Sequence, residues 1–226
     1  MRKIRSEALL VSRITPLPQN RFAEFVHRMS RNHSTLARIA RSLLPLCAIL
    51  LGACAGDRAH VVRVSVADQR MALYKDGVEV RRFPVSTSKF GVGDTPGSNR
   101  TPLGCMEVAK KIGASAPLGM KFKSRQPTGE IVPVNAPGRD PIVTRILWLR
   151  GLERRNANAF SRMIYIHGTP EESKLGTPAS YGCIRMKSKD IVQLFNMVGN
   201  GAKVIVDTEH LPQPILAPQI QIARVQ

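Results

Sequence analysis

The chain has no uninterrupted apolar run long enough to cross a membrane as a helix. Its longest such run, residues 43–53, covers about eleven residues, whereas a bilayer-spanning helix needs roughly 20. Zinc-binding motifs are missing too, because the five histidines occur singly and none belongs to an H-E-x-x-H pattern. The sequence therefore predicts no transmembrane helix and no metal site, and nothing in it implies an organic cofactor.

Acidic residues are few, 16 against 34 Lys and Arg, and the formal net charge is +18. The excess persists without the first 54 residues, because residues 55–226 hold 25 basic against 14 acidic side chains. A surface this basic attracts polyanions. No helix-turn-helix pattern, zinc-finger spacing or aromatic RNA-binding motif accompanies the charge, so we expect no nucleic-acid partner.

Aromatic residues make up only 5% of the chain, whereas Gly and Pro are frequent, with 17 and 16 residues. Short apolar segments between turn residues favour β structure. A hydrophobic content of 43% is enough to form a core. The 226 residues allow one domain of ordinary size with a leader and a tail.

The apolar run at residues 43–53 has the features of an export signal, since Arg38 and Arg41 precede it and small residues follow. Residues 51–54 (LGAC) resemble a lipobox, after which a bacterial lipoprotein is cut so that Cys54 receives a lipid. We therefore expect residues 1–54 to be a lipoprotein-type signal and the rest to be periplasmic and anchored to a membrane. Cleavage by an ordinary signal peptidase is the alternative, and Met29 is a better-placed start than Met1.

A mainly β domain is predicted over residues 60–207. Residues 60–66 and 70–74 alternate apolar and polar side chains, and Asp76-Gly77 predicts a hairpin turn into a strand at 78–85. Residues 86–104, rich in Gly, Ser, Thr and Pro, are expected to form a long loop. Further strands are predicted at 142–149, 163–166 and 202–206.

One helix is predicted over residues 188–198. Ser188 is expected to cap it, Asp190 lies in its first turn, and Gly199 follows its end. Four apolar residues share one face that can pack on a sheet: Ile191, Leu194, Phe195 and Val198. The Pro- and Gln-rich segment 208–226 is expected to be a flexible tail.

Elimination leaves His167 as the one histidine deep inside the domain, and Cys105 and Cys183 as its cysteines. Cys183 lies in the segment SYGCIRM, residues 180–186, immediately before the predicted helix. Gly182 allows a tight turn whose backbone N–H groups can converge on one point, as an oxyanion hole requires.

A free thiol titrates near ~8.5, and a neighbouring imidazole can lower that pKa so that the reactive thiolate forms. Cys183 is therefore the candidate nucleophile and His167 its base, with Arg185 adding positive charge nearby. The carbonyl of Gly168 would suffice to fix the tautomer of the His167 ring. Two alternatives stay open: an inert buried cysteine, and a Cys105–Cys183 disulfide in an oxidising compartment.

Taken together, the segment I-H-G-T, twelve residues between its His and a later Ser, and S-x-G-C-I-R-M before a helix resemble the L,D-transpeptidase catalytic domain, the YkuD family. The resemblance extends over about 150 residues. Residues 69–74 (QRMALY) look like the family's opening hairpin, and residues 84–88 with 101–104 resemble its V-S-T-G and T-P-x-G loop.

The resemblance implies a β-sandwich-like fold and a cysteine acyl-enzyme. Cys183 would attack the carbonyl between the third residue of a peptidoglycan stem and its terminal D-alanine, His167 would shuttle protons, and the carbonyl of Gly168 would orient the imidazole. Backbone amides around Tyr181, Gly182 and Cys183 would hold the oxyanion. Arg185 and Ser180 would organise the pocket or bind substrate. An amine acceptor would then give a 3–3 crosslink or a wall-attached protein.

Two departures leave the acceptor open. Many relatives have His at the position of Tyr181, and the loop 88–99 and the insert 124–140 are specific to this chain's subgroup. Loops over a pocket usually set specificity. Four basic residues are candidates for contact with wall carboxylates, or are simply solvated: Lys121, Lys123, Arg125 and Arg139.

Other cysteine enzymes fit less well. Sortases need a T-L-x-T-C motif, which is absent, and papain-like and NlpC-type peptidases place the Cys before the His. An L,D-carboxypeptidase, in which water replaces the amine, fits the same residues. A non-catalytic wall-binding module is the alternative from another class.

Overall fold

The structure, a computed structural model, describes residues 56–138 and 140–213. The predicted export signal with Cys54, the basic residue Arg139 and the tail beyond residue 213 lie outside the described residues. No described helix has the length and apolar character needed to span a membrane.

The described residues form a mainly β domain with one α-helix. In chain order the elements are β1 (His60–Ser65), β2 (Arg70–Lys75), β3 (Val78–Pro84), β4 (Gly104–Ile112), β5 (Met120–Lys123), β6 (Gln126–Ile131), β7 (Ile142–Gly151), the 3-10 helix η2 (Arg154–Asn156), β8 (Tyr165–Gly168), the 3-10 helix η3 (Glu172–Lys174), β9 (Ile184–Met186), α2 (Ser188–Met197) and β10 (Lys203–Asp207). The predicted fold class, mainly β with a single helix after Cys183, is confirmed.

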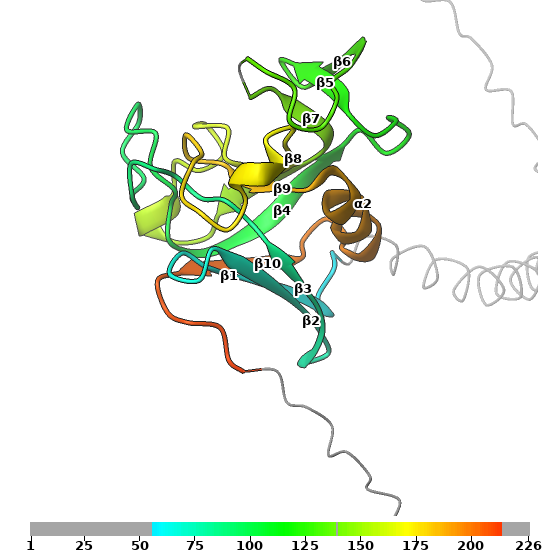
Figure 1. The fold of residues 1–226 in the computed structure, drawn as a ribbon. Coiled ribbons are helices and arrows are strands. Elements are labelled where there is room, and N and C mark those ends of the chain that lie inside the picture. Colours follow the sequence, from blue (N-terminus) through cyan, green and yellow to red (C-terminus); the bar gives the residue numbers. More distant parts are fainter. Residues whose placement is uncertain (1–55, 139, 214–226) are drawn as a thin grey trace, which may run out of the picture. The chain divides into compact units, whose positions relative to one another are not determined.

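The strands form one strongly bent sheet in the order β3-β2-β1-β10-β4-β7-β5-β6. The other edge of β7 pairs with β8, which in turn pairs with β9. Figure 1 shows β1, β2, β3 and β10 in one half, β7, β8 and β9 in the other, and β4 running between them. The chain thus joins its two sheet halves through long-range pairings of β4.

The core fills the space between these halves and under α2. It includes residues from both, all with exposed fractions of at most 5%, such as Val62, Leu73, Met106, Leu149, Ile166, Ile184 and Leu194. Complete burial of a Leu or Ile side chain stabilises a domain by roughly 1.5–3 kcal/mol. This packing holds β8 and β9, the two strands that carry the candidate site residues.

Local sequence signals account for the first hairpin. Asp76 and Gly77 both have positive φ, 50° and 82°, which a two-residue hairpin turn between twisted strands requires. The predicted strands at 60–66, 70–74 and 78–85 correspond to β1, β2 and β3 within one or two residues.

The helix was predicted with the correct first residue and an end one residue too late, but its capping residue differs. Lys187 occupies the N-cap position without a side-chain hydrogen bond, and Ser188 is already helical. The Ser188 amide donates to Glu172 Oε1 at 2.9 Å, and its hydroxyl accepts from Thr144 Oγ1 at 2.8 Å. Ser188 as the cap is therefore wrong, because a carboxylate from η3 satisfies the first turn instead.

Strands β4, β5, β6 and β9 were not predicted, and the strand expected at 163–166 begins two residues later, at Tyr165. Met163 has a φ of 57°, a left-handed conformation that turns the chain and excludes a strand there. Strand β6 is exposed throughout and contains Pro127, as expected for an edge strand protected from further pairing.

The first residues of the predicted tail contact the domain. Leu211 is buried, and its amide donates to Asp68 Oδ2 at 2.7 Å. The Pro212 carbonyl accepts from Arg82 at 2.6 Å. The start of the segment after β10 therefore makes a few contacts with the domain, although Leu211 is the only buried residue among 208–213.

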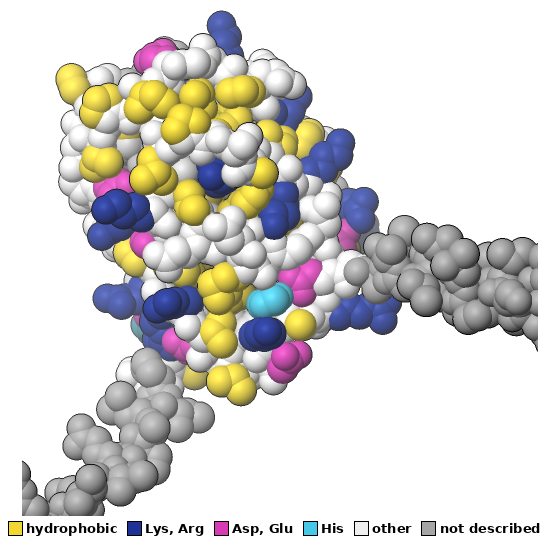
Figure 2. All heavy atoms as spheres, turned by 90° about the vertical axis from the view of Figure 1, so that its right-hand side faces the viewer, with side chains coloured by type: hydrophobic (Ala, Val, Ile, Leu, Met, Phe, Trp, Pro, Cys, Tyr) yellow, Lys and Arg dark blue, Asp and Glu magenta, His cyan; other side chains and the backbone are white. Residues whose placement is uncertain are grey.

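Hydrophobic side chains gather on one face of the domain, at the level of β5 and β6 in Figure 1 (Figure 2). Leu118, Ile131 and Val134 are each about half exposed there. They line a groove of about 600 Å³ that also reaches the first turn of α2.

Candidate active site

Parallel pairing of β8 with β9 brings the two predicted catalytic residues to neighbouring positions. The register places His167 opposite Arg185 and Ile166 opposite Ile184. Cys183 precedes β9 and continues this register opposite Tyr165. Side chains two residues apart on a strand share a face, so Cys183 and His167 lie on one face of the sheet, diagonal to each other.

The Cys183 thiol is hydrogen-bonded to the backbone. Its Sγ lies 3.4 Å from the carbonyl oxygen of Met163, to which it donates. The residue is partly exposed, but its sulfur is closely surrounded by protein, and this burial raises the pKa of the Cys183 thiol to about 11, with a backbone hydrogen bond of Tyr165 and the charge of Arg185 opposing the rise. The direction of this shift is opposite to the lowering expected from a neighbouring imidazole.

His167 is buried, and its ring orientation is fixed. Its Nδ1 lies 2.9 Å from the carbonyl oxygen of Gly168. A carbonyl oxygen only accepts, so Nδ1 carries the hydrogen and Nε2 is left as the basic nitrogen. Burial lowers the pKa of His167, although the nearby charge of Asp140 and the Gly168 hydrogen bond work against this lowering. The imidazole is therefore neutral and able to accept a proton.

Gly168 occupies a place where only glycine fits. A Cβ there would lie 2.6 Å from the Val143 carbonyl oxygen and 3.1 Å from Thr144 Cβ. The crowding arises at an irregularity of β7, where the register shifts after Val143 and Thr144 has a φ of 72°. This close approach of β7 to β8 sets the position of the carbonyl that holds the His167 ring.

The loop before Cys183 is held by internal hydrogen bonds. Ser180 is fully buried; its hydroxyl donates to the Cys183 carbonyl at 2.6 Å and accepts from the Gly182 amide at 3.2 Å. Thr101 Oγ1 donates to the Gly182 carbonyl at 3.0 Å. Of the two roles expected for Ser180, the geometry favours organisation of this loop over contact with substrate.

Gly182 has a φ of 113°, and a Cβ there would approach the Arg100 carbonyl oxygen to 3.2 Å, so this turn requires glycine. The Gly182 amide is already bonded to Ser180 and is not free for an oxyanion. The amides of Tyr181 and Cys183 donate to no other residue in the part of the chain that the structure describes. These two remain as candidate oxyanion donors.

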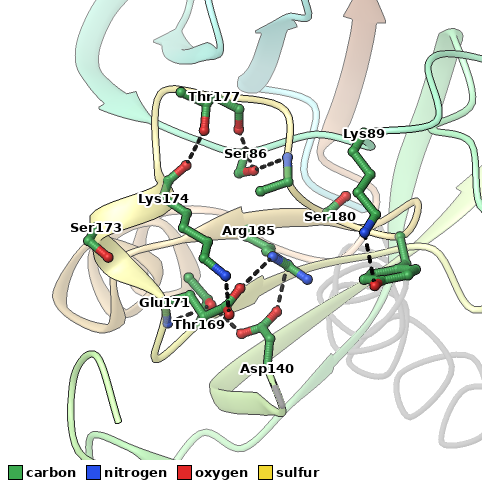
Figure 3. Close-up of polar contacts among 12 residues, drawn as sticks. Ser86, Lys89, Asp140, Thr169, Glu171, Ser173, Lys174, Thr177, Ser180 and Arg185 are labelled. Atoms are coloured by element: carbon green, nitrogen blue, oxygen red, sulfur yellow. Dashed lines mark hydrogen bonds and ion pairs between the residues drawn. The ribbon is translucent and has the colours of Figure 1, made fainter. Parts of the chain in front are cut away.

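Arg185 is buried between two carboxylates. Its Nε lies 2.6 Å from Asp140 Oδ2 and its Nη1 lies 3.1 Å from Glu171 Oε2. Asp140 also accepts a hydrogen bond from the Thr169 hydroxyl. Figure 3 shows both acidic side chains directed at the guanidinium. Arg185 is therefore neutralised and organises the pocket, and Asp140 and Glu171, which the sequence analysis did not select, complete the site.

A cavity of about 530 Å³ lies beside this network. Its lining residues are Lys89, Gly138, Asp140, Glu171, Lys174, Ala179, Tyr181 and Arg185. Tyr181, two residues before Cys183 in the sequence, is 57% exposed and forms part of the wall of this cavity. Tyr181 thus stands at the solvent side of the candidate site.

A second cavity of about 570 Å³ has Arg125, Phe122 and Trp148 in its wall. Arg125 lies 3.4 Å from the Tyr165 hydroxyl and 3.3 Å from the sulfur of Met163, the residue whose carbonyl bonds the thiol. Of the other basic candidates, Lys121 is ion-paired with Glu130 at 2.7 Å and Lys123 is exposed. Arg125 is thus the candidate, among the three that the structure describes, that contacts Met163 and Tyr165.

Cys105 and Cys183 are both free thiols. The alternative of a disulfide between them is therefore not realised in this structure. Within residues 56–138 and 140–213, no group of three or more His, Cys, Asp or Glu is arranged to hold a metal ion.

A family model and two curated relatives that match this chain all belong to the same family. A sequence model of the YkuD family, the L,D-transpeptidase catalytic domain, matches residues 59–206. The putative L,D-transpeptidase YkuD of Bacillus subtilis (strain 168) is 32% identical over 88 residues, 38% of this chain and 48% of the relative. Its namesake from Bacillus licheniformis is 33% identical over 87 residues, 38% of this chain and 47% of the relative. The matched part spans about half the length of these curated relatives.

Solved structures of similar proteins include L,D-transpeptidase 3 from Mycobacterium tuberculosis, 22% identical, with a TM-score of 0.44 and coverage of 66% of this chain and 61% of that one. Another is an L,D-transpeptidase from Mycobacterium smegmatis, 19% identical, with a TM-score of 0.43 and coverage of 66% and 58%.

Proposed function

Because the chain belongs to the L,D-transpeptidase catalytic domain family, we propose that it is a cysteine acyltransferase acting on peptidoglycan stem tetrapeptides. The observation that carries the proposal is the pairing of β8 with β9, which sets Cys183 and His167 on one face, together with the 2.9 Å contact that fixes the His167 ring through Gly168. A nucleophile, a base and a group that orients the base are what covalent acyl transfer requires.

In the first half-reaction the thiol turns from the Met163 carbonyl towards His167 Nε2. The Cys183 sulfur attacks the carbonyl carbon of the third stem residue while Nε2 takes the thiol proton. The resulting oxyanion is held by the amides of Tyr181 and Cys183. Collapse of the intermediate breaks the C–N bond, and the imidazolium returns its proton to the leaving D-alanine amine. A thioester on Cys183 remains.

In the second half-reaction an amine of another stem attacks the thioester. His167 takes the proton of the amine, the C–S bond breaks, and the thiolate of Cys183 recovers the proton. The product is a 3–3 crosslink, or an attachment when the amine belongs to a wall-bound protein. Water in place of the amine gives the L,D-carboxypeptidase reaction.

The proton affinities of the pair favour attack coupled to proton transfer over a preformed ion pair. Burial raises the pKa of Cys183 to about 11 and lowers the pKa of His167. Both groups are then neutral at rest, and a thiolate–imidazolium pair is uphill. Charge develops only as the sulfur reacts, when the oxyanion donors begin to act.

Export as a lipoprotein through Cys54 remains part of the proposal. It rests on the basic flank, the short apolar run at residues 43–53 and the LGAC segment. Peptidoglycan lies outside the cytoplasm, so the proposed substrate requires this location. Fractionation of cells that express the full chain, with Cys54→Ala for comparison, tests it: the wild-type protein should sediment with membranes, and the variant should not.

The test of the activity is product analysis after incubation with tetrapeptide muropeptides. Dimers joined 3–3 indicate transpeptidation, and tripeptides alone indicate the carboxypeptidase. Cys183→Ala should abolish both products, with Cys105→Ala as the matched control that retains them. If wild-type protein binds muropeptides but yields neither product, the wall-binding module is the correct alternative and the proposed reaction is wrong.

A further inference from the structure

Lys89 stands opposite the nucleophile loop in a fixed position. Its backbone amide donates to the Ser180 carbonyl at 3.1 Å, next to a bridge between Ser88 and Ser180. Its Nζ donates to the Tyr181 hydroxyl at 3.0 Å and lies 4.4 Å from the centre of that ring. Figure 3 shows the Lys89 side chain extended beside Ser180, with a dashed line from its ammonium nitrogen to the Tyr181 hydroxyl.

The other cations of the 530 Å³ cavity already have acidic partners. Arg185 is paired with Asp140 and Glu171, and Lys174 lies 2.6 Å from Glu171. Within the described residues, Lys89 is the lining cation that has no carboxylate within ion-pair distance. The cavity therefore carries a net positive charge, and that charge is concentrated at Lys89.

We propose that Lys89, positioned by Tyr181, binds a carboxylate of the donor stem in this cavity and makes the enzyme select substrates in which that carboxylate is free. This inference rests on the proposed function. A tetrapeptide offers two carboxylates close to the scissile bond: that of the terminal D-alanine, and that on the side chain of a third residue such as diaminopimelate. Both present the same acceptor oxygens to an ammonium group.

Neutral contacts hold Lys89 without neutralising it. The hydroxyl of Tyr181 and the ring faces of Tyr181 and Phe90, the latter 5.3 Å from Nζ, orient the ammonium group. An orienting aromatic partner reduces the side-chain entropy lost on binding. Lys89 is nevertheless exposed, so we expect a selectivity of about tenfold rather than the larger effect of a buried pair.

The test compares three donor tetrapeptides: one with both carboxyl groups free, one amidated on the side chain of residue three, and one ending in D-alaninamide. The readout is kcat/KM for release of the terminal group by wild-type protein, Lys89→Gln, Lys89→Arg and Tyr181→Phe. Lys203→Gln is the matched control, because it removes one exposed lysine on β10. Binding of the same peptides to Cys183→Ala and to Cys183→Ala/Lys89→Gln, by calorimetry, supplies a readout without turnover.

Wild-type protein should prefer the free form over one of the two amides by about tenfold, and that amide identifies the carboxylate. Lys89→Gln should lower kcat/KM only for peptides that keep this carboxylate and so remove the preference. Lys89→Arg should keep it, Tyr181→Phe should reduce it, and Lys203→Gln should leave it unchanged.

Equal effects of Lys89→Gln on all three peptides, or none on any, would overturn the inference while leaving the proposed reaction in place. Absence of turnover by wild-type protein would contradict the proposed reaction alone, provided that Cys183→Ala still distinguishes free from amidated peptide through Lys89. Absence of both turnover and discrimination in binding would overturn both.

Discussion

The Nδ1 atom of His167 lies 2.9 Å from the carbonyl oxygen of Gly168, the next residue in β8. A histidine bonded in this way to its own strand needs no carboxylate to set its tautomer. Asp140 influences the imidazole through its charge, but its carboxylate is engaged by Arg185 and Thr169. The Gly168 carbonyl of β8 is therefore the group that fixes the ring and leaves Nε2 as the basic nitrogen.

Replacement of Gly168 should damage stability and activity together. In Gly168→Ala the new Cβ would lie 2.6 Å from the Val143 carbonyl oxygen, and overpacking of this kind costs about 1–3 kcal/mol. β8 must shift, so the carbonyl that holds His167 moves and kcat should fall. Urea unfolding and steady-state kinetics measure the two effects. Gly77→Ala, which meets no atom within 4 Å, should cost only the strain of its positive φ and leave kcat unchanged.

The thiol of Cys183 should alkylate slowly at neutral pH. Its burial raises the pKa to about 11, so at pH 8 only about a thousandth of the thiol is thiolate. The rate of reaction with iodoacetamide, followed by mass spectrometry of the peptide that contains residue 183, should keep rising from pH 7 to beyond pH 10. A plateau already reached by pH 7 would show a preformed thiolate–imidazolium pair and contradict the neutral resting state.

The Arg185 network should be essential for folding. The side chains of Arg185 and Asp140 are 6% and 8% exposed, and removal of one partner from a buried pair costs about 3–5 kcal/mol because the other charge is left uncompensated. Arg185→Met should lower the free energy of unfolding by that amount. Arg150→Gln breaks an ion pair with Glu107 in which the Arg is 61% exposed, and should cost less than about 1 kcal/mol. Equal losses of unfolding free energy in the two variants would contradict the role of Arg185 as a buried, structure-stabilising ion-pair partner.

Ser180→Ala should impair catalysis more than binding. The hydroxyl joins the Cys183 carbonyl to the Gly182 amide, and its loss frees the loop that carries the nucleophile. We expect kcat to fall at least about tenfold with little change in KM, because even a small misplacement of a reacting group strongly lowers the rate of the chemical step. A rise in KM at constant kcat would instead assign Ser180 to substrate contact.

Local patterns predicted only part of the fold. The hairpin of β2 and β3 was predicted from apolar residues spaced two apart, and the apolar face of α2 from apolar residues spaced three to four apart. Both elements are present in the structure. Strand β4 was missed because its second half contains Lys110 and Lys111, and its partners, β10 and β7, lie far away in the sequence. Such pairing depends on distant residues that no local window contains.

The candidate site residues were predictable where a reactive residue type lies within a short, recognisable sequence segment. Cys183 and His167 stand in short, specific segments, and in the structure His167 lies on β8 while Cys183 immediately precedes β9, the strand paired with β8. Asp140 comes from an irregular insert and Glu171 from a turn, so their approach to Arg185 has no local signal. The left-handed Thr144, which shapes the surroundings of Gly168, is β-branched and would not be expected in that conformation.

The most direct test of the account is intact-protein mass spectrometry after incubation with a carbapenem, a β-lactam that acylates active-site nucleophiles. Wild-type domain and Cys105→Ala should each gain the mass of one carbapenem, located on Cys183 by peptide mapping. Cys183→Ala should gain none, and His167→Ala should gain it much more slowly. An adduct that persists in Cys183→Ala, or a wild-type protein that gains no mass, would contradict the assignment of Cys183 as the nucleophile.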